Sequence, residues 1–91
     1  METKHPNLIK LGKIIREARE KKGLSQEVFA AEAQLGRTYV GRIERGEQNI
    51  SIQNLIQIAL VLELEVSSLI PPLNELEVPY SKQPKKNKKS K

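Results

Sequence analysis

Apolar residues recur at steps of three and four along the first third of the chain, which is the spacing of one face of an α-helix. The first run predicts a helix over residues 8–22, ended by Gly23, whose inward face is formed by Leu8, Leu11, Ile15 and Ala18. Ser25 is suited to cap a second, shorter helix that ends near Ala33, with an inward face of Val28, Phe29 and Ala33. Two helices are therefore predicted before residue 34.

A third short helix is expected over residues 37–45, ended by Gly46, with Val40 and Ile43 as its buried positions. Residues 34–36 leave room for only a tight turn between the second helix and the third. Two short helices joined by such a turn follow the plan of a helix-turn-helix.

The longest apolar segment begins after Ser51, which is suited to cap a helix that runs to Leu62. This helix is apolar on nearly every face, so we expect it to be the buried centre of the bundle, surrounded by the others. The alternation over residues 62–66 has no second such run to pair with, and we interpret it as a connection. A fifth helix over residues 66–70 is expected to end at the two prolines that follow. The pattern predicts an all-α fold, a compact five-helix bundle that contains a helix-turn-helix.

Composition divides the chain into one domain with two flexible ends. The domain is expected to span residues 8–78, because apolar residues that can pack on the bundle recur as far as Val78. Residues 1–7 are expected to form a flexible N-terminus. Residues 79–91 are expected to form a disordered lysine-rich tail, because they contain too few apolar groups to offset the entropy of ordering.

The formal net charge of +5 results from 16 Lys and Arg against 11 Asp and Glu. Six of the lysines lie within residues 82–91, so residues 1–81 contain ten basic and eleven acidic side chains. The basic tail predicts a salt-dependent attraction to a polyanion such as DNA. The rest of the chain is polarised, since its ten basic residues all precede residue 51, whereas residues 52–81 carry four acidic residues and no basic one.

Composition also argues against several classes of function. The chain has no cysteine and a single histidine, His5, so cysteine-based zinc sites and hydrolytic triads are hard to assemble. We therefore expect no enzymatic activity, no metal and no cofactor. The longest apolar run has five residues, far below the about 20 needed to cross a bilayer, and the N-terminus lacks the apolar core of a signal peptide. We expect a cytoplasmic protein, associated with the bacterial nucleoid and without a membrane partner.

The side chains left outward on the third predicted helix have the chemistry for contacts with DNA, because the second helix of a helix-turn-helix enters the major groove. Arg37 and Arg42 match guanine O6 and N7, and the methyl group of Thr38 can contact that of thymine. Tyr39 can pack on a thymine or donate to a phosphate. Two alternatives stay open: the arginines form only a solvated helix face, or Tyr39 packs within its own helix pair.

Over residues 11–70 the chain resembles the lambda-repressor and Cro-like (XRE-type) helix-turn-helix family. The resemblance rests on Leu11-Gly12, Ile15, Arg19, Gly23-Leu24-Ser25-Gln26, Phe29-Ala30, Val40, Ile43-Glu44-Arg45-Gly46, Ser51 and Leu62-Glu63-Leu64. Within the family, the segments 37–41 and 43–49 are most similar to the controller proteins of restriction-modification systems, which are small dimeric regulators. The resemblance implies five helices, with the second and third as the DNA-binding pair.

The resemblance, taken position by position, also implies which residues contact DNA. The base-contacting residues, with Tyr39 added from its own chemistry, are Arg37, Thr38, Tyr39 and Arg42. The backbone-contacting residues, at the start of the second helix and after the third, are Ser25, Gln26, Arg45, Gln48 and Asn49. Gln26 is further implied to brace the third helix. Arg19 and Glu44 are implied to form a structural ion pair that joins the first helix to the third.

Four positions depart from the family pattern. Gln34 occupies the place of the usual turn glycine, where a left-handed backbone would carry strain. Gly36 replaces the usual cap residue, which glycine can do. Gly41 costs the third helix about 1 kcal/mol against alanine, for which a close approach to DNA is one explanation. Gln48 stands where controller proteins commonly have arginine, which alters one predicted backbone contact.

The acidic second half of the chain would be repelled by DNA, so we expect it to face a second copy of the chain. The candidate interface residues, some of which could instead be internal core, are Leu62, Leu64, Val66, Leu69, Ile70 and Leu73. A two-fold dimer would hold its two recognition helices about 34 Å apart, on an inverted-repeat operator.

These observations together predict a dimeric, sequence-specific transcription regulator that acts as the controller protein of a restriction-modification system. Its expected partners are double-stranded DNA, a second copy of the chain and RNA polymerase. Two alternatives stay open, a phage-type or solitary repressor and an antitoxin-like regulator that acts through protein contact.

Overall fold

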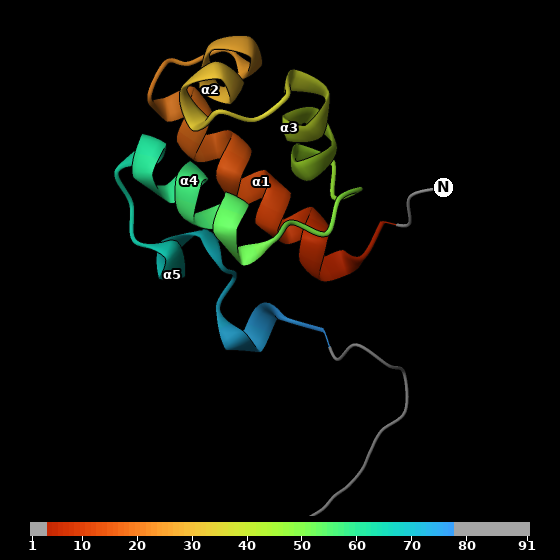
Figure 1. Cartoon of the computed structure of the whole chain (residues 1–91). Coiled ribbons are helices and arrows are strands. Elements are labelled where there is room, and N and C mark those ends of the chain that lie inside the picture. Colours follow the sequence, from red (N-terminus) through yellow and green to blue (C-terminus); the bar gives the residue numbers. More distant parts are fainter. Residues whose placement is uncertain (1–3, 78–91) are drawn as a thin grey trace, which may run out of the picture.

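A computed structural model of the chain describes residues 4–77, and all of its regular structure within them is helical (Figure 1). The elements are α1 (Pro6–Lys21), α2 (Gln26–Ala33), α3 (Arg37–Glu44), α4 (Ile52–Leu62), α5 (Val66–Leu69) and the 3-10 turn η1 (Leu73–Glu75). Within the alternating segment, residues 63–65 form the predicted connection between α4 and α5, and the described residues contain no strand. The prediction of an all-α five-helix bundle is confirmed.

Helix α1 begins two residues before the boundary expected at residue 8. His5 is its N-cap, and His5 Nδ1 accepts a hydrogen bond from the backbone N–H of Asn7 at 3.1 Å. Pro6 follows at the first helical position, where its fixed φ suits the helix and its missing N–H is not needed. Residues 5–7, which the sequence assigned to a flexible N-terminus, therefore form the cap and first turn of α1.

The turn of the helix-turn-helix has a left-handed backbone at Gln34, a conformation that is unfavourable for a residue other than glycine. Ser25 caps α2, with its Oγ accepting from the backbone N–H of Val28 at 3.1 Å. At the other end Gln34 adopts a left-handed conformation, with φ 60° and ψ 39°, and the N–H of Leu35 then bonds to the carbonyl of Ala30. This conformation costs a residue with a Cβ about 1 kcal/mol or more. Gly36 begins α3 as its N-cap, without a side-chain hydrogen bond.

Each of the five helices contributes at least one fully buried side chain to a single core. The largest of these are Phe29, Ile15, Ile43, Ile58, Leu69 and Val40. The prediction that Val28 points inward is wrong, because its residue is 46 % exposed. The inward face of α2 is instead formed by Phe29, Ala30 and Ala33, and the turn of 100° per residue carries Val28 to the outside.

The expectation that α4 is surrounded by the other helices is also wrong. Its buried residues are Leu55, Ile58, Ala59 and Leu62, whereas Ile52, Ile56 and Leu60 are 67 %, 39 % and 72 % exposed. Helix α4 packs chiefly against α2 and α5, and no further helix within residues 4–77 covers its other side. Because residues four apart share a helix face, the three exposed side chains form one row, which we call the α4 apolar stripe.

Two of the residues predicted for a dimer interface belong to the core of the protomer. Leu62 and Leu69 are 5 % and 0 % exposed, so they cannot contact a partner, because they already fill the space between α4, α5 and the other helices. Val66 is half-buried against the same core. The remaining candidates, Leu64, Ile70 and Leu73, are 41 %, 40 % and 86 % exposed.

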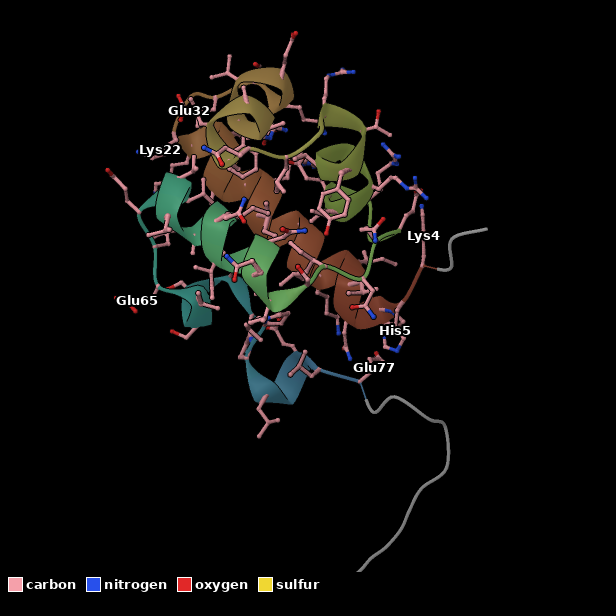
Figure 2. The ribbon with its side chains drawn as sticks, in the orientation of Figure 1. Lys4, His5, Lys22, Glu32, Glu65 and Glu77 are labelled. Atoms are coloured by element: carbon pink, nitrogen blue, oxygen red, sulfur yellow. The ribbon has the colours of Figure 1, made fainter. Side chains whose placement is uncertain are left out.

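The segment after α5 folds back onto the first turn of α1. Asn7 Nδ2 donates to the carbonyl of Glu77 at 2.9 Å, and the N–H of Glu77 donates to Asn7 Oδ1 at 2.7 Å. Leu76 lines a cleft together with Leu8 and Ile70. Figure 2 shows Glu77 near His5 at this end of the molecule, opposite the end that carries Lys22 and Glu32. Val78 and the lysine-rich tail of residues 79–91 lie outside the described residues.

No single helix among residues 4–77 is both long and apolar enough to cross a membrane. Helix α4 and the segment Val66–Glu75 satisfy that test only when they are joined, and they meet at an angle of 99°. Four apolar side chains of α4 are buried in the core described above, which accounts for the apolar character of this pair.

Candidate nucleic-acid interface

Helix α3 has a buried face and an outward face, and the arginine and threonine candidates lie on the outward one. Val40, Gly41, Ile43 and Glu44 are buried against the rest of the bundle. Arg37 and Thr38 are exposed at the start of the helix, and Arg42 is half-buried one turn further on. The structure therefore brings three of the four base-contacting candidates to the outside of one short helix.

The inner side of α3 is tied to α1 by a buried ion pair between Arg19 and Glu44. Arg19 Nε donates to Glu44 Oε2 at 2.7 Å and Arg19 Nη2 to Glu44 Oε1 at 3.1 Å, and both residues are 8 % exposed. A third bond runs from Arg19 Nη1 to the carbonyl of Leu24 at 2.7 Å. The hydrogen bond to Glu44 is the largest influence on the pKa of Arg19 and raises it above its ordinary value. Arg19 is thus held in its charged form at the junction of α1 and α3.

Gln26 joins helix α2 to the same carboxylate. Its Nε2 donates to Glu44 Oε1 at 3.0 Å, so Glu44 accepts three side-chain hydrogen bonds from two other helices. We call Glu44 and its two partners, Arg19 and Gln26, the Glu44 network. Through it, the first turn of α2 and the last turn of α1 both fix the position of α3. Ser25, next to Gln26, is exposed at the N-terminus of α2.

Gly41 lies where protein side chains already occupy the adjacent space. A Cβ atom at this position would lie 3.1 Å from Arg45 Nη1 and 3.7 Å from Gln26 Oε1. Contacts inside the protein therefore explain the glycine as well as a close approach of DNA would. Glycine is less favourable than alanine in a helix, but an alanine at this position would have to displace the side chain of Arg45.

The three backbone-contacting candidates after α3 lie at its C-terminal end and in the loop that leads to α4. Arg45 is the C-cap of α3, and its Nε donates to Glu47 Oε1 at 3.1 Å, with its side chain 55 % exposed. Gln48 is half-buried and Asn49 is exposed. The nearby Lys4 Nζ lies 3.9 Å from Glu47 Oε2, so Glu47 pairs with two basic residues at this edge.

Tyr39, the fourth base-contacting candidate, combines packing against the protein with a polar contact. Its ring is half-buried against the core, and its hydroxyl accepts a hydrogen bond from Asn54 Nδ2 in α4 at 2.8 Å. Asn54 was not singled out in the sequence, although it is one of few polar residues within an apolar helix. Gln57, another such residue, donates from Nε2 to the carbonyl of Ala33 at 2.7 Å. Polar residues inside an apolar run are a signal that could have identified both contacts.

Gly12 is a further position whose role the sequence did not reveal. A Cβ atom on it would lie against the carbonyl oxygen of Ile43 and 2.7 Å from that of Glu44. Helices α1 and α3 therefore approach each other at backbone distance beside the Glu44 network. A glycine in the interior of a predicted helix is a known signal of such close packing.

The site offers hydrogen-bond donors and positive charge. Residues 4–77 contain no group of three or more His, Cys, Asp or Glu residues that could hold a metal ion. The outward donors of α3 suit an acceptor-rich, negatively charged surface such as DNA.

Comparisons with known proteins agree with this geometry. A family model described as helix-turn-helix matches residues 15–69. The control protein C.MunI from a Mycoplasma species is 40 % identical over 68 residues, which cover 74 % of this chain and 92 % of the relative. The crystal structure of the restriction-modification controller protein C.AhdI from Aeromonas hydrophila superposes with a TM-score of 0.71 at 42 % identity, covering 72 % of this chain and all of that one. The structure of C.Esp1396I bound to a 19 base pair DNA duplex superposes with a TM-score of 0.63 at 35 % identity, covering 68 % and 83 %.

Proposed function

The chain belongs to the XRE-type helix-turn-helix family, and from this premise we propose that it is a dimeric transcription regulator that controls restriction-modification genes. The observation that carries the proposal is the outward row of donors on α3, held from behind by the buried Glu44 network. A recognition helix needs a fixed orientation, because base edges are recognised through hydrogen bonds of defined geometry. The names of the similar control proteins support the biological assignment.

The DNA contacts that we propose follow from the positions of the donors. Arg37, Thr38 and Arg42 contact base edges in the major groove, and Tyr39 contributes its hydroxyl beside them. The exposed N-terminus of α2 contacts a phosphate through Ser25 and Gln26, since free N–H groups and the helix dipole favour an anion there. The loop after α3 contributes Arg45, Gln48 and Asn49 to the neighbouring phosphates.

The test of this proposal is Arg37→Ala on a DNA site obtained by selection from randomised duplexes. Loss of a bidentate contact to guanine should weaken binding to the selected site by about 1 to 3 kcal/mol, or about fivefold to 150-fold, and relax the preference at one base pair. Equilibrium binding to the selected site and to each single-base variant measures both effects.

The matched control is Arg16→Ala, which removes the same charge from an exposed position on α1, where Arg16 Nε lies 3.9 Å from Glu20 Oε2. It should weaken binding to selected and random DNA by similar, small factors, because it removes only long-range attraction. If Arg37→Ala behaved like this control and left discrimination unchanged, Arg37 would not contact a base.

For the dimer we propose an interface built from exposed apolar residues of the second half of the chain. It comprises the first two residues of the α4 apolar stripe together with three of the predicted positions, namely Ile52, Ile56, Leu64, Ile70 and Leu73. The acidic residues Glu63, Glu65 and Glu75 lie in the same half, and Glu63 Oε1 lies 3.3 Å from Nζ of Lys22 at the end of α1. Such a dimer binds an inverted repeat with its recognition helices about 34 Å apart.

As a regulator of promoters in the bacterial nucleoid, it has RNA polymerase as a further partner.

Ile56→Glu should dissociate this dimer. A two-fold interface brings two copies of the introduced carboxylate close together in an apolar contact, which should raise the dimer dissociation constant by about thirtyfold or more, or about 2 kcal/mol. Sedimentation equilibrium measures the constant. Val28→Glu is the control, because it places the same charge on an exposed apolar residue of α2 outside the proposed interface. A native chain that stays monomeric, or an Ile56→Glu variant that dimerises normally, would contradict this interface.

A further inference from the structure

The hydrogen bond between Asn54 and Tyr39 connects the first turn of α4 to the recognition helix. Asn54 Nδ2 donates to Tyr39 Oη at 2.8 Å across 15 residues of sequence. Both residues are half-buried, so their contact is partly shielded from competing water.

Asn54 is itself held firmly in place. Its backbone N–H donates to the Oγ of Ser51, the N-cap of α4, at 3.1 Å. The capped first turn fixes the backbone from which the carboxamide projects, and it leaves the side chain free to make its own contact. Asn54 is therefore suited to hold another group in position.

The direction of the bond determines what Tyr39 can offer to DNA. A tyrosine hydroxyl has one proton to donate and also accepts hydrogen bonds. Because the hydroxyl accepts from Asn54, its proton remains for an acceptor outside this pair. Phosphate oxygens and most base edges in the major groove are acceptors, and Tyr39 adjoins the exposed Thr38 on α3.

We propose that Asn54 is a positioning residue for DNA recognition, which orients the Tyr39 hydroxyl so that its proton points to DNA. The inference rests on the proposed function and adds to it a residue from α4, outside the helix-turn-helix. In this arrangement Asn54 supports the contact between the Tyr39 hydroxyl and DNA, but it does not touch DNA itself. The role in DNA recognition explains why Asn54, a polar residue, stands in the mostly apolar helix α4.

A double-mutant cycle tests the proposal on the full chain, with the selected duplex and a random duplex as probes. Asn54→Ala and Tyr39→Phe should each weaken binding to the selected duplex about fivefold, the usual effect of losing one hydrogen bond. The combined variant should bind within about twofold of Tyr39→Phe alone, because Asn54 acts only through the hydroxyl. Binding to the random duplex should change less in every case.

Asn54→Asp separates positioning from a merely structural role. The carboxylate has nearly the shape of the amide but only accepts hydrogen bonds, so it takes the Tyr39 proton for itself. The melting temperature of Asn54→Asp should stay the same or rise, because an acidic residue in the first turn of α4 is favourable. The ratio of its affinity for the selected duplex to that for the random duplex should fall about fivefold. Gln53→Glu adds the same charge to the same turn at an exposed position, and it should lower both affinities without changing their ratio.

The outcomes distinguish the two proposals. If Asn54→Ala weakens specific binding as strongly in the Tyr39→Phe background as in the native one, or leaves it unchanged in the native one, Asn54 does not act through Tyr39. The proposed function still stands in that case, provided that Arg37→Ala relaxes discrimination. If Arg37→Ala also leaves discrimination unchanged, the proposed function itself is wrong.

Discussion

Replacing Glu44 by alanine should lower the free energy of unfolding by about 3 to 5 kcal/mol, as much as truncating a large side chain in the core. The loss leaves the guanidinium of Arg19, only 8 % exposed, without its carboxylate partner. Arg19 cannot escape the cost by losing its proton, because arginine stays protonated in proteins even without a carboxylate partner. Gln26 loses its acceptor at the same time.

The expected loss is a large part of the total stability, because a small domain is stable by only about 5 to 15 kcal/mol. Urea denaturation measures it directly. In conditions where the variant still folds, its affinity for selected DNA should fall more than its affinity for random DNA, since the Glu44 network holds α3 in its orientation.

Glu20→Ala provides a matched control on the same arginine. Glu20 Oε2 lies 3.8 Å from Arg19 Nη2, but its side chain is 58 % exposed, and exposed ion pairs contribute less than about 1 kcal/mol. The two variants therefore remove a carboxylate from the same guanidinium and differ in burial and hydrogen bonding. Equal destabilisation by both would show that the buried pair is no more important than an exposed one.

Gly12→Ala should also be strongly destabilising, with a loss of about 2 to 3 kcal/mol in the free energy of unfolding. Helix propensity alone would predict a gain of about 1 kcal/mol, because alanine favours the interior of α1. The geometry reverses the sign, since the new Cβ would lie 2.7 Å from the carbonyl oxygen of Glu44 and 2.9 Å from its carbon. These are backbone atoms of α3 that cannot rotate away, so the two helices must separate and the packing of Ile15 and Ile43 must loosen.

Gly36→Ala is the control for this steric argument, because a Cβ atom there meets nothing within 4 Å. It should cost no more than about 1 kcal/mol, through the weaker capping of α3 by alanine. Thermal and urea denaturation of both variants make the comparison. A Gly12→Ala variant as stable as the native chain would mean that α1 and α3 can separate freely.

The sequence predicted helices better than it predicted which of their faces are covered. Ser25 and Ser51 were identified as caps from residue type and position, and both accept the expected backbone hydrogen bond. Val28 was predicted to point inward, and α4 to lie at the centre, because apolar character indicates burial. The chain has more apolar residues than it has buried positions. A helix that is apolar all round gives no internal signal of which side its neighbours cover, so the exposure of Ile52 and Leu60 could not be foreseen.

By itself, the sequence determined the helices, their caps, the tight turn and the family, because these depend on spacing and chemistry among residues close together in the chain. Apart from the Arg19–Glu44 pair that the family resemblance implied, the tertiary structure decided which atoms of the side chains meet across the bundle. The bond from Gln26 to Glu44 spans 18 residues and that from Asn54 to Tyr39 spans 15, and the close approach at Gly12 depends on the backbone of another helix. No local pattern encodes such contacts, because they arise only when helices pack at particular distances and angles.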